Sequence, residues 1–181
     1  GVGKCSLTEA LPIISAAGVE CAVLPTTVLS THTAFEGFTF HDLTDDLPGI
    51  AAHWAQLGLQ FSTIYTGYLG SIKQIGIVQD IFRSLRKPDA KTFVDPAMAD
   101  NGKLYTGFDA DFPKEMLKLC AGADVIMPNI TEACFLLDIP YPGEDYDRPY
   151  IEGMCRDLLK KTGSKQAILT GVSFEQGRPE S

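Results

Sequence analysis

The chain has 181 residues, of which 45% are hydrophobic and 21% charged, and its formal net charge is -8. This composition is that of an ordinary globular protein, and the length corresponds to one domain or most of one. The negative charge argues against nucleic-acid binding, and the sequence shows neither an apolar run of the ~20 residues that a membrane helix needs nor a signal-peptide pattern.

The opening GVGKCS raises the question of a nucleotide-binding P-loop. In that motif a Ser or Thr follows the Lys directly, whereas Cys5 follows Lys4 here and the glycines have the wrong spacing. We therefore interpret the opening as a tight turn before a helix, and expect any phosphate chemistry elsewhere in the chain.

Hydrophobic residues then recur at helical spacing in several segments, with short apolar or β-branched runs between them. The predicted helices cover 7–17, 45–57, 71–85, 113–121, 131–137 and 151–161. The predicted strands cover 21–25, 62–67, 92–96, 124–128 and 166–171. Polar composition predicts loops at 26–42 and 139–149.

Alternating strands and helices predict an α/β fold, a three-layer sandwich with a mostly parallel central sheet and helices on both faces. No linker or internal repeat divides the chain, so we expect a single domain over 1–181. Sheets of this kind bind ligands at the carboxyl ends of their strands. The residues that follow each predicted strand are therefore the first candidates for a functional site.

Asp95 and Asp100 bracket the loop that follows one of these strands, in DPAMAD. One interpretation is a carboxylate pair that holds water-bound Mg²⁺ or orients a phosphate group. The other is turn chemistry, because Asp, Asn, Pro and Gly all favour turns and DNG is itself a turn signal.

Asn129 and Glu132 lie in PNITE, at the junction of a buried strand and a helix. The spacing predicts a capping box, with Asn129 as the N-cap and Glu132 as its partner. It also places both polar groups at a helix start, where anions bind, so the structural and the functional interpretation are compatible.

Two further loops carry candidate ligand contacts. His32 lies in STHT, where it would hydrogen-bond either a polar ligand or the loop backbone. Tyr68 lies between glycines in GYLGS, where its ring would stack on a flat substrate or pack against the sheet edge. None of these motifs is specific alone.

Together, STHT, GYLGS, DPxMxD and PNxxE in this order and at these separations resemble the pyridoxal kinase branch of the ribokinase-like family. The likeness covers nearly the whole chain. It implies a kinase that transfers the γ-phosphoryl group of ATP to the hydroxymethyl group of pyridoxal, pyridoxine or pyridoxamine, in vitamin B6 salvage. It further implies Mg²⁺, a monovalent cation such as K⁺, a homodimer and a small-molecule substrate.

The resemblance also implies a role for each matching residue. The pyridine substrate would contact His32, Thr33, Tyr68 and, more weakly, Tyr105. The nucleotide would lie near Asp95, Asn129, Glu132 and Thr170. Metal ions would be organised by Asp95, Asp100 and Glu132, largely through water.

The family's GxGD motif, whose Asp is the catalytic base, does not occur in these residues. We therefore expect a chain that lacks the first strand and the part that contains GxGD, and no catalytic base among its residues. Alternatives are a hydroxymethylpyrimidine kinase, a non-catalytic relative that binds a B6 compound, and an unrelated doubly wound domain.

Five scattered cysteines form no CxxC pair, and the three histidines show no metal-ligand spacing. An odd number of scattered cysteines favours reduced thiols and a cytoplasmic location over a disulfide framework or a zinc site.

Overall fold

The computed structural model describes residues 7–31 and 35–174, and the chain divides into two compact units. Unit 1 comprises residues 1–60 and 68–85, and unit 2 comprises residues 61–67 and 86–181. The chain therefore enters unit 2 for one strand, returns to unit 1 for one helix and then stays in unit 2.

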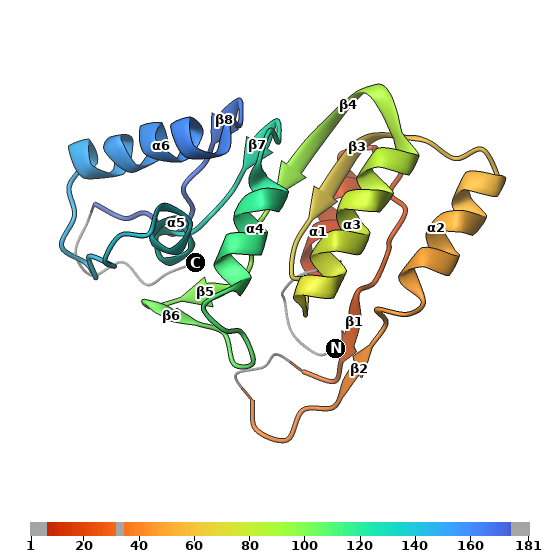
Figure 1. Ribbon diagram of the computed structural model, residues 1–181, viewed down its shortest axis with the longest axis horizontal. Helices are drawn as coiled ribbons and strands as arrows, with labels where there is room; N and C mark the ends of the chain where they lie inside the picture. Colours follow the sequence, from red (N-terminus) through yellow and green to blue (C-terminus); the bar gives the residue numbers. More distant parts are fainter. Residues whose placement is uncertain (1–6, 32–34, 175–181) are drawn as a thin grey trace. The chain divides into compact units, whose positions relative to one another are not determined.

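Unit 2 is built on a parallel sheet with the strand order β3-β4-β7-β8 (Figure 1). The strands are β3 (Phe61–Thr66), β4 (Arg86–Val94), β7 (Val125–Ile126) and β8 (Gln166–Ala167). Parallel strands need long crossover connections. Helix α4 (Phe112–Cys120) lies in the connection from β4 to β7, and α5 (Ile130–Leu137) and α6 (Arg148–Thr162) lie between β7 and β8. This parallel sheet with its helical connections confirms the predicted α/β class.

The core of unit 2 is formed by apolar side chains from the strands and from the three helices, which also contact one another. The bulkiest apolar side chains of unit 2 that are at most 1% exposed are Val94, Met116, Ile126, Leu136 and Leu158, together with Met98 from the loop after β4. Burial alternates with a period of two in the second half of β4, from Ala90 to Val94, as expected for a strand with one covered face, whereas the first four residues of β4 are exposed.

Unit 1 contains α1 (Leu7–Ala16), β1 (Thr27–Leu29), β2 (Phe40–Asp42), α2 (Leu47–Gln56) and α3 (Ile72–Leu85). Helices α2 and α3 pack against each other, and Leu47 and Ile75 are buried. The predicted stop after the first helix is confirmed, because Gly18 has a φ of +77° that residues other than glycine rarely adopt.

The predicted strand at 21–25 is wrong, since these residues belong to no strand of the described structure. A short apolar run forms a strand only where a neighbour pairs with its backbone, and Pro25 has no N–H to offer. Instead β1 and β2 form an antiparallel pair, with Val28 opposite His41, inside the segment predicted as a polar loop. Most residues around these two short strands are polar, so the hydrophobic pattern of the sequence did not indicate strands there.

The DNG turn signal is confirmed. Strands β5 (Ala99–Asp100) and β6 (Lys103–Leu104) form an antiparallel hairpin. Asn101 and Gly102 join them with φ values of 50° and 74°, the combination that a tight primed turn requires.

Among the described residues, no helix combines the length and the apolar character that crossing a bilayer demands.

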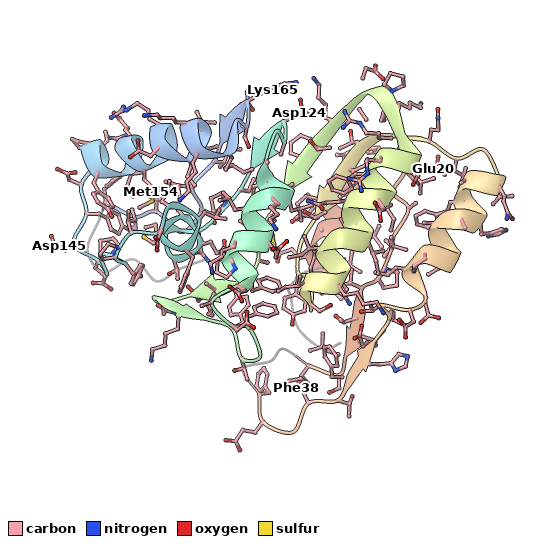
Figure 2. All side chains as sticks on the ribbon, viewed as in Figure 1. Glu20, Phe38, Asp124, Asp145, Met154 and Lys165 are labelled. Atoms are coloured by element: carbon pink, nitrogen blue, oxygen red, sulfur yellow. The ribbon has the colours of Figure 1, made fainter. Side chains whose placement is uncertain are left out.

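Asp124 ties three strands together at the start of β7. It accepts hydrogen bonds from the backbone N–H of Thr92 at 2.9 Å and from Lys165 Nζ at 2.7 Å, and Lys91 Nζ lies 3.7 Å away. Figure 2 shows Asp124 and Lys165 beside each other at this end of the sheet. The hydrogen bond from Lys165 is the largest of the contributions that lower the pKa of Asp124 to about 2.

We expect Asp124→Asn to lower the free energy of unfolding by about 1–3 kcal/mol at pH 7, because it weakens the bonds to Thr92 and Lys165 at a mostly buried position. Since the pKa of Asp124 is lowered from 3.8 to about 2, its stabilisation is complete above pH 3.8 and is lost as the pH falls through 2. Urea unfolding measures the free energy of unfolding of both proteins. The difference between the wild type and the variant should become smaller as the pH is lowered from 5 to 3.

The control is Asp80→Asn, which removes an exposed ion pair with Arg83 on α3 and should change stability little. An equal loss of unfolding free energy in the two variants would contradict the role of Asp124 in joining the strands.

Candidate functional site

The carboxyl ends of the parallel strands in unit 2 bring four of the predicted residues to one edge of the sheet. Asp95 follows the last residue of β4, and its backbone N–H donates to the carbonyl of Thr66 at the end of β3. Asn129 lies three residues after β7 and forms a parallel bridge with Thr170, three residues after β8. We call Asp95, Asn129, Glu132 and Thr170 the strand-end cluster.

Asn129 and Glu132 form the predicted capping box at the start of α5. The Asn129 side chain accepts a hydrogen bond from the backbone N–H of Glu132, and the Glu132 carboxylate accepts one from the backbone N–H of Asn129, both at 2.8 Å. The Asn129 amide also donates to the carbonyl of Ala99 at 2.8 Å. The cap therefore fixes both side chains and joins α5 to the loop after β4.

Glu132 is buried, with 3% of its surface exposed. While one carboxylate oxygen takes the capping bond, the other accepts the backbone N–H of Met98 at 3.1 Å. Met98 itself is fully buried. A single carboxylate thus holds both the first turn of α5 and the loop that carries Asp95.

Burial raises the pKa values of both carboxyl groups. It raises the pKa of Asp95 to about 6, against the opposing hydrogen bond from Tyr65 Oη at 3.4 Å. It raises that of Glu132 to about 8, and the negative charge of Asp95 adds to the rise, while the bonds from Asn129 and Met98 oppose it. The charges of Asp95 and Glu132 therefore interact electrostatically, and burial keeps water from screening them fully.

This pair of carboxylates fits a cation. Carboxylate oxygens are the ligands that Mg²⁺ prefers, and a positive ion would offset both the burial and the mutual repulsion. Within residues 7–31 and 35–174, no three His, Cys, Asp or Glu side chains form a group that could hold a metal ion. A pair of carboxylates is a donor set that fits Mg²⁺, which usually keeps several waters and takes one or two carboxylates from a protein.

Asp100, the third predicted metal residue, lies in the β5–β6 hairpin. It is exposed, and its carboxylate accepts hydrogen bonds from the backbone N–H and the side-chain amide of Asn101, at 2.8 and 3.1 Å. The structure thus gives Asp100 a turn-forming role and no bond to the strand-end cluster.

The hairpin itself is fastened beside the cluster. The N–H of Gly102 donates to Thr131 Oγ1 at 3.1 Å, and the N–H of Tyr105 donates to the carbonyl of Met98 at 2.9 Å. Tyr105, a predicted substrate contact, is half-buried.

The sequence analysis did not identify Tyr65 and Thr131 as site residues. Only their positions, near the end of a strand and at the start of a helix, could have indicated them.

Thr66, at the end of β3, carries the one buried side-chain polar atom without a hydrogen-bond partner in the described structure. The hydroxyl oxygen is buried, and the residue as a whole is 7% exposed. A buried polar group of this kind calls for an ordered water or a ligand. It therefore marks the same sheet edge as Asp95.

Tyr68 belongs to unit 1, where it is half-buried, and burial raises its pKa. Its carbonyl accepts a hydrogen bond from Thr26 Oγ1 at 3.1 Å. The other two predicted substrate contacts, His32 and Thr33, lie outside the described residues.

Pyridoxal kinases are among the known proteins that this chain resembles. No family model matches the chain. Pyridoxal kinase of Arabidopsis thaliana is 26% identical over 157 residues, which cover 80% of this chain and 46% of the relative. The chain spans less than half the length of the curated relatives that it matches, 39% to 46%.

Two solved structures are more similar. A Bacteroides thetaiotaomicron protein, provisionally named a phosphomethylpyrimidine kinase and crystallised with pyridoxal, is 46% identical with a TM-score of 0.90. The match covers 98% of this chain and 61% of that one. Pyridoxal kinase from Lactobacillus plantarum is 35% identical with a TM-score of 0.84, over 96% of this chain and 61% of that one.

The raised pKa values predict an unusual dependence of stability on pH. Because the folded state holds Asp95 and Glu132 with pKa values of about 6 and 8, above their ordinary 3.8 and 4.5, their protonated forms favour folding. In the presence of a chelator, the contribution of these two groups to the free energy of unfolding should be complete only below about pH 4, their ordinary pKa range, and should fall by a few kcal/mol as the pH rises through 6 towards 8.

Urea unfolding at half-unit steps of pH measures this slope, and the same series on Glu132→Gln should be flatter, because the variant has no proton to lose. Addition of Mg²⁺ should restore stability at pH 8 in the wild type more than in the variant. A wild-type stability that rises between pH 5 and pH 8 would show that these carboxyls are not buried as described.

Proposed function

We propose that this chain, which belongs to the pyridoxal kinase family, contributes the nucleotide and ring-binding residues of an ATP-dependent kinase that phosphorylates the hydroxymethyl group of a vitamin B6 compound. The observation that carries the proposal is the convergence of Asp95, Asn129 and Glu132 at the carboxyl ends of neighbouring parallel strands. This is the edge at which open α/β sheets bind ligands. The similarity to a protein crystallised with pyridoxal supports the choice of substrate.

In the proposed enzyme, the strand-end cluster faces the phosphates of ATP. Phosphoryl transfer asks the protein mainly to position the reactants and to neutralise charge. Mg²⁺, when bound, would supply the positive charge that this acidic chain lacks. Asp95 and Glu132 would hold it largely through water, Asn129 and Thr170 would lie along the nucleotide, and Asp100 would approach the cation region from its hairpin.

The local structure suits this task because the carboxylates are held before any ligand arrives. Glu132 is fixed by the backbone N–H groups of Asn129 and Met98, so little freedom remains to be lost on binding. A monovalent cation such as K⁺ is part of the proposal by family likeness, as are a homodimer and a cytoplasmic location.

On the substrate side, the proposal places the pyridine ring against Tyr68, with His32, Thr33 and Tyr105 as further contacts. An aromatic ring offers a flat apolar face to a flat heteroaromatic substrate. We assign the catalytic base to no residue of this chain, because GxGD does not occur in it.

A second candidate is a hydroxymethylpyrimidine kinase. It is favoured by the 46% identity to a protein that bears a phosphomethylpyrimidine kinase name. Both substrates are flat heteroaromatic rings with a hydroxymethyl group, so the same arrangement of side chains suits either.

A substrate panel separates these functions. The full-length protein, assayed for ADP formation with ATP and Mg²⁺, should phosphorylate pyridoxal, pyridoxine or pyridoxamine with a kcat/KM at least about tenfold above that for hydroxymethylpyrimidine, a difference of roughly 1.4 kcal/mol in transition-state binding. The reverse order would establish the second candidate. Pyridoxal binding without any ADP formation would establish a non-catalytic relative.

A metal titration tests the role of Glu132. Glu132→Gln in the full-length protein should raise the Mg²⁺ concentration for half-maximal rate by about tenfold or more, because residues that organise a metal through its bound waters affect metal affinity on this scale. The control is Glu152→Gln, the same change at an exposed position on α6. An unchanged Mg²⁺ requirement in Glu132→Gln would remove this residue from the metal site.

A further inference from the structure

Gln74 is a buried polar residue that neither the sequence motifs nor the proposed function uses. It lies in the first turn of α3, and none of its surface is exposed. The other buried residues of this helix are apolar, namely Ile75, Val78, Ile81 and Leu85. A buried amide among apolar neighbours needs hydrogen-bond partners to offset its loss of water.

All of the Gln74 amide is engaged. Its oxygen accepts the backbone N–H of Gly70 at 2.7 Å. Its nitrogen donates to the carbonyl of Thr26 at 3.0 Å, to Thr44 Oγ1 at 2.9 Å and to the Asp42 carboxylate at 3.1 Å. The amide has only this orientation available, because an N–H can only donate and a carbonyl can only accept.

These partners come from separate segments of unit 1. Thr26 directly precedes β1, Asp42 ends β2, and Gly70 lies in the GYLGS loop before α3. Asp42 is itself fixed, since it also accepts hydrogen bonds from the backbone N–H of Thr44 at 2.9 Å and from the Thr44 hydroxyl. Gln74 therefore anchors the GYLGS loop to the β1–β2 pair.

Two contacts carry this anchoring to Tyr68. The hydroxyl of Thr26 donates to the Tyr68 carbonyl at 3.1 Å. A Cβ atom placed on Gly70 would lie 3.7 Å from Tyr68 Cε1, so the ring lies close to the residue whose N–H Gln74 holds. The backbone of Tyr68 is thus bonded to the Gln74 network, and its ring lies beside the backbone of Gly70 that Gln74 holds.

We propose that Gln74 is a positioning residue that holds the Tyr68 ring in place for a flat heteroaromatic substrate, acting through Gly70 and Thr26. The inference rests on the proposed function, in which Tyr68 contacts the substrate ring. A ring that is already held loses less conformational freedom when the substrate binds, and substrate affinity rises accordingly. The proposed function places the nucleotide at the strand-end cluster of unit 2 and not at this loop, so we expect its affinity not to depend on Gln74.

The test compares three variants of the full-length protein at a temperature well below their unfolding. Gln74→Met keeps the length of the side chain but leaves the N–H of Gly70 and the carbonyl of Thr26 without their partner. Thr26→Val removes the hydroxyl that bonds Tyr68 and keeps its shape. The control, Val78→Ala, removes buried apolar surface from the same helix without touching the network.

We expect Gln74→Met to raise the KM for pyridoxal about tenfold, the factor that corresponds to one hydrogen bond, and Thr26→Val to raise it by about threefold to tenfold. The KM for ATP should change by less than about twofold in both of these variants relative to the wild type. Val78→Ala should lower the melting temperature but change neither the KM for pyridoxal nor the KM for ATP. A change of both KM values in parallel, or a Gln74→Met that behaves as Val78→Ala does, would overturn the proposal.

A double-mutant cycle asks whether Gln74 acts through Tyr68. In a Tyr68→Ala background, Gln74→Met should raise the KM for pyridoxal by less than about twofold, because the ring that it positions is gone. A full tenfold rise in that background would overturn the proposal.

Failure of the proposed function has a different signature. A wild-type protein that neither binds nor phosphorylates pyridoxal would refute the function itself. Wild-type kinase activity together with an unaffected Gln74→Met variant would refute only the positioning role.

Discussion

The buried carboxylate of Glu132 is the interaction on which the strand-end cluster depends. Its two oxygens accept the N–H groups of Asn129 and Met98, and these residues belong to two segments that are more than 25 residues apart in sequence. Without this acceptor, the first turn of α5 and the loop after β4 would each hold a buried N–H without a partner, which is costly. The position of Asp95 at the sheet edge follows from this bond and from the bond of its own N–H to Thr66.

The same carboxylate is held against an electrostatic penalty. Two N–H groups lower its pKa, but burial and the nearby charge of Asp95 outweigh them and raise it to about 8. Such an arrangement costs stability when both groups are ionised, and natural proteins accept costs of this kind mainly at functional sites. A cation would reverse the sign of the local field, so the feature that weakens the free protein would strengthen the proposed complex with a metal nucleotide.

Much of this edge could be predicted from the sequence, because its signals are local. The capping box needs only Asn129 and the residue three positions on, and the placement of Asp95 needs only the end of a hydrophobic strand. The family likeness and the ribokinase-like fold, which the structural comparisons confirm, rest on the same short motifs. Asp100 shows the limit of local reading, since the sequence offered it both as a candidate metal residue and as part of a turn, and only the turn can be recognised from its bonds to Asn101.

The features that could not be predicted depend on partners far away in the sequence. The β1–β2 pair joins two short segments within a stretch that looks like a polar loop, and the run at 21–25 has the composition of a strand but no strand to pair with. Gln74 interrupts the apolar pattern of α3, which on local grounds argues for an exposed side chain. Its burial follows from acceptors that lie 48 and 32 residues earlier, at Thr26 and Asp42.

Glu132 and Gln74 solve the same structural problem with different chemistry. Each is a buried side chain at the start of a helix that holds the backbone of a neighbouring loop, Glu132 in unit 2 and Gln74 in unit 1. The carboxylate can only accept, and its charge makes its loop sensitive to protons and cations. The amide donates and accepts without charge, and it holds the loop through the uncharged backbone N–H of Gly70, so this bond does not depend on protons or cations. This division suits the proposed kinase, in which the residues assigned to the phosphates would respond to the metal while the loop that carries Tyr68 would not.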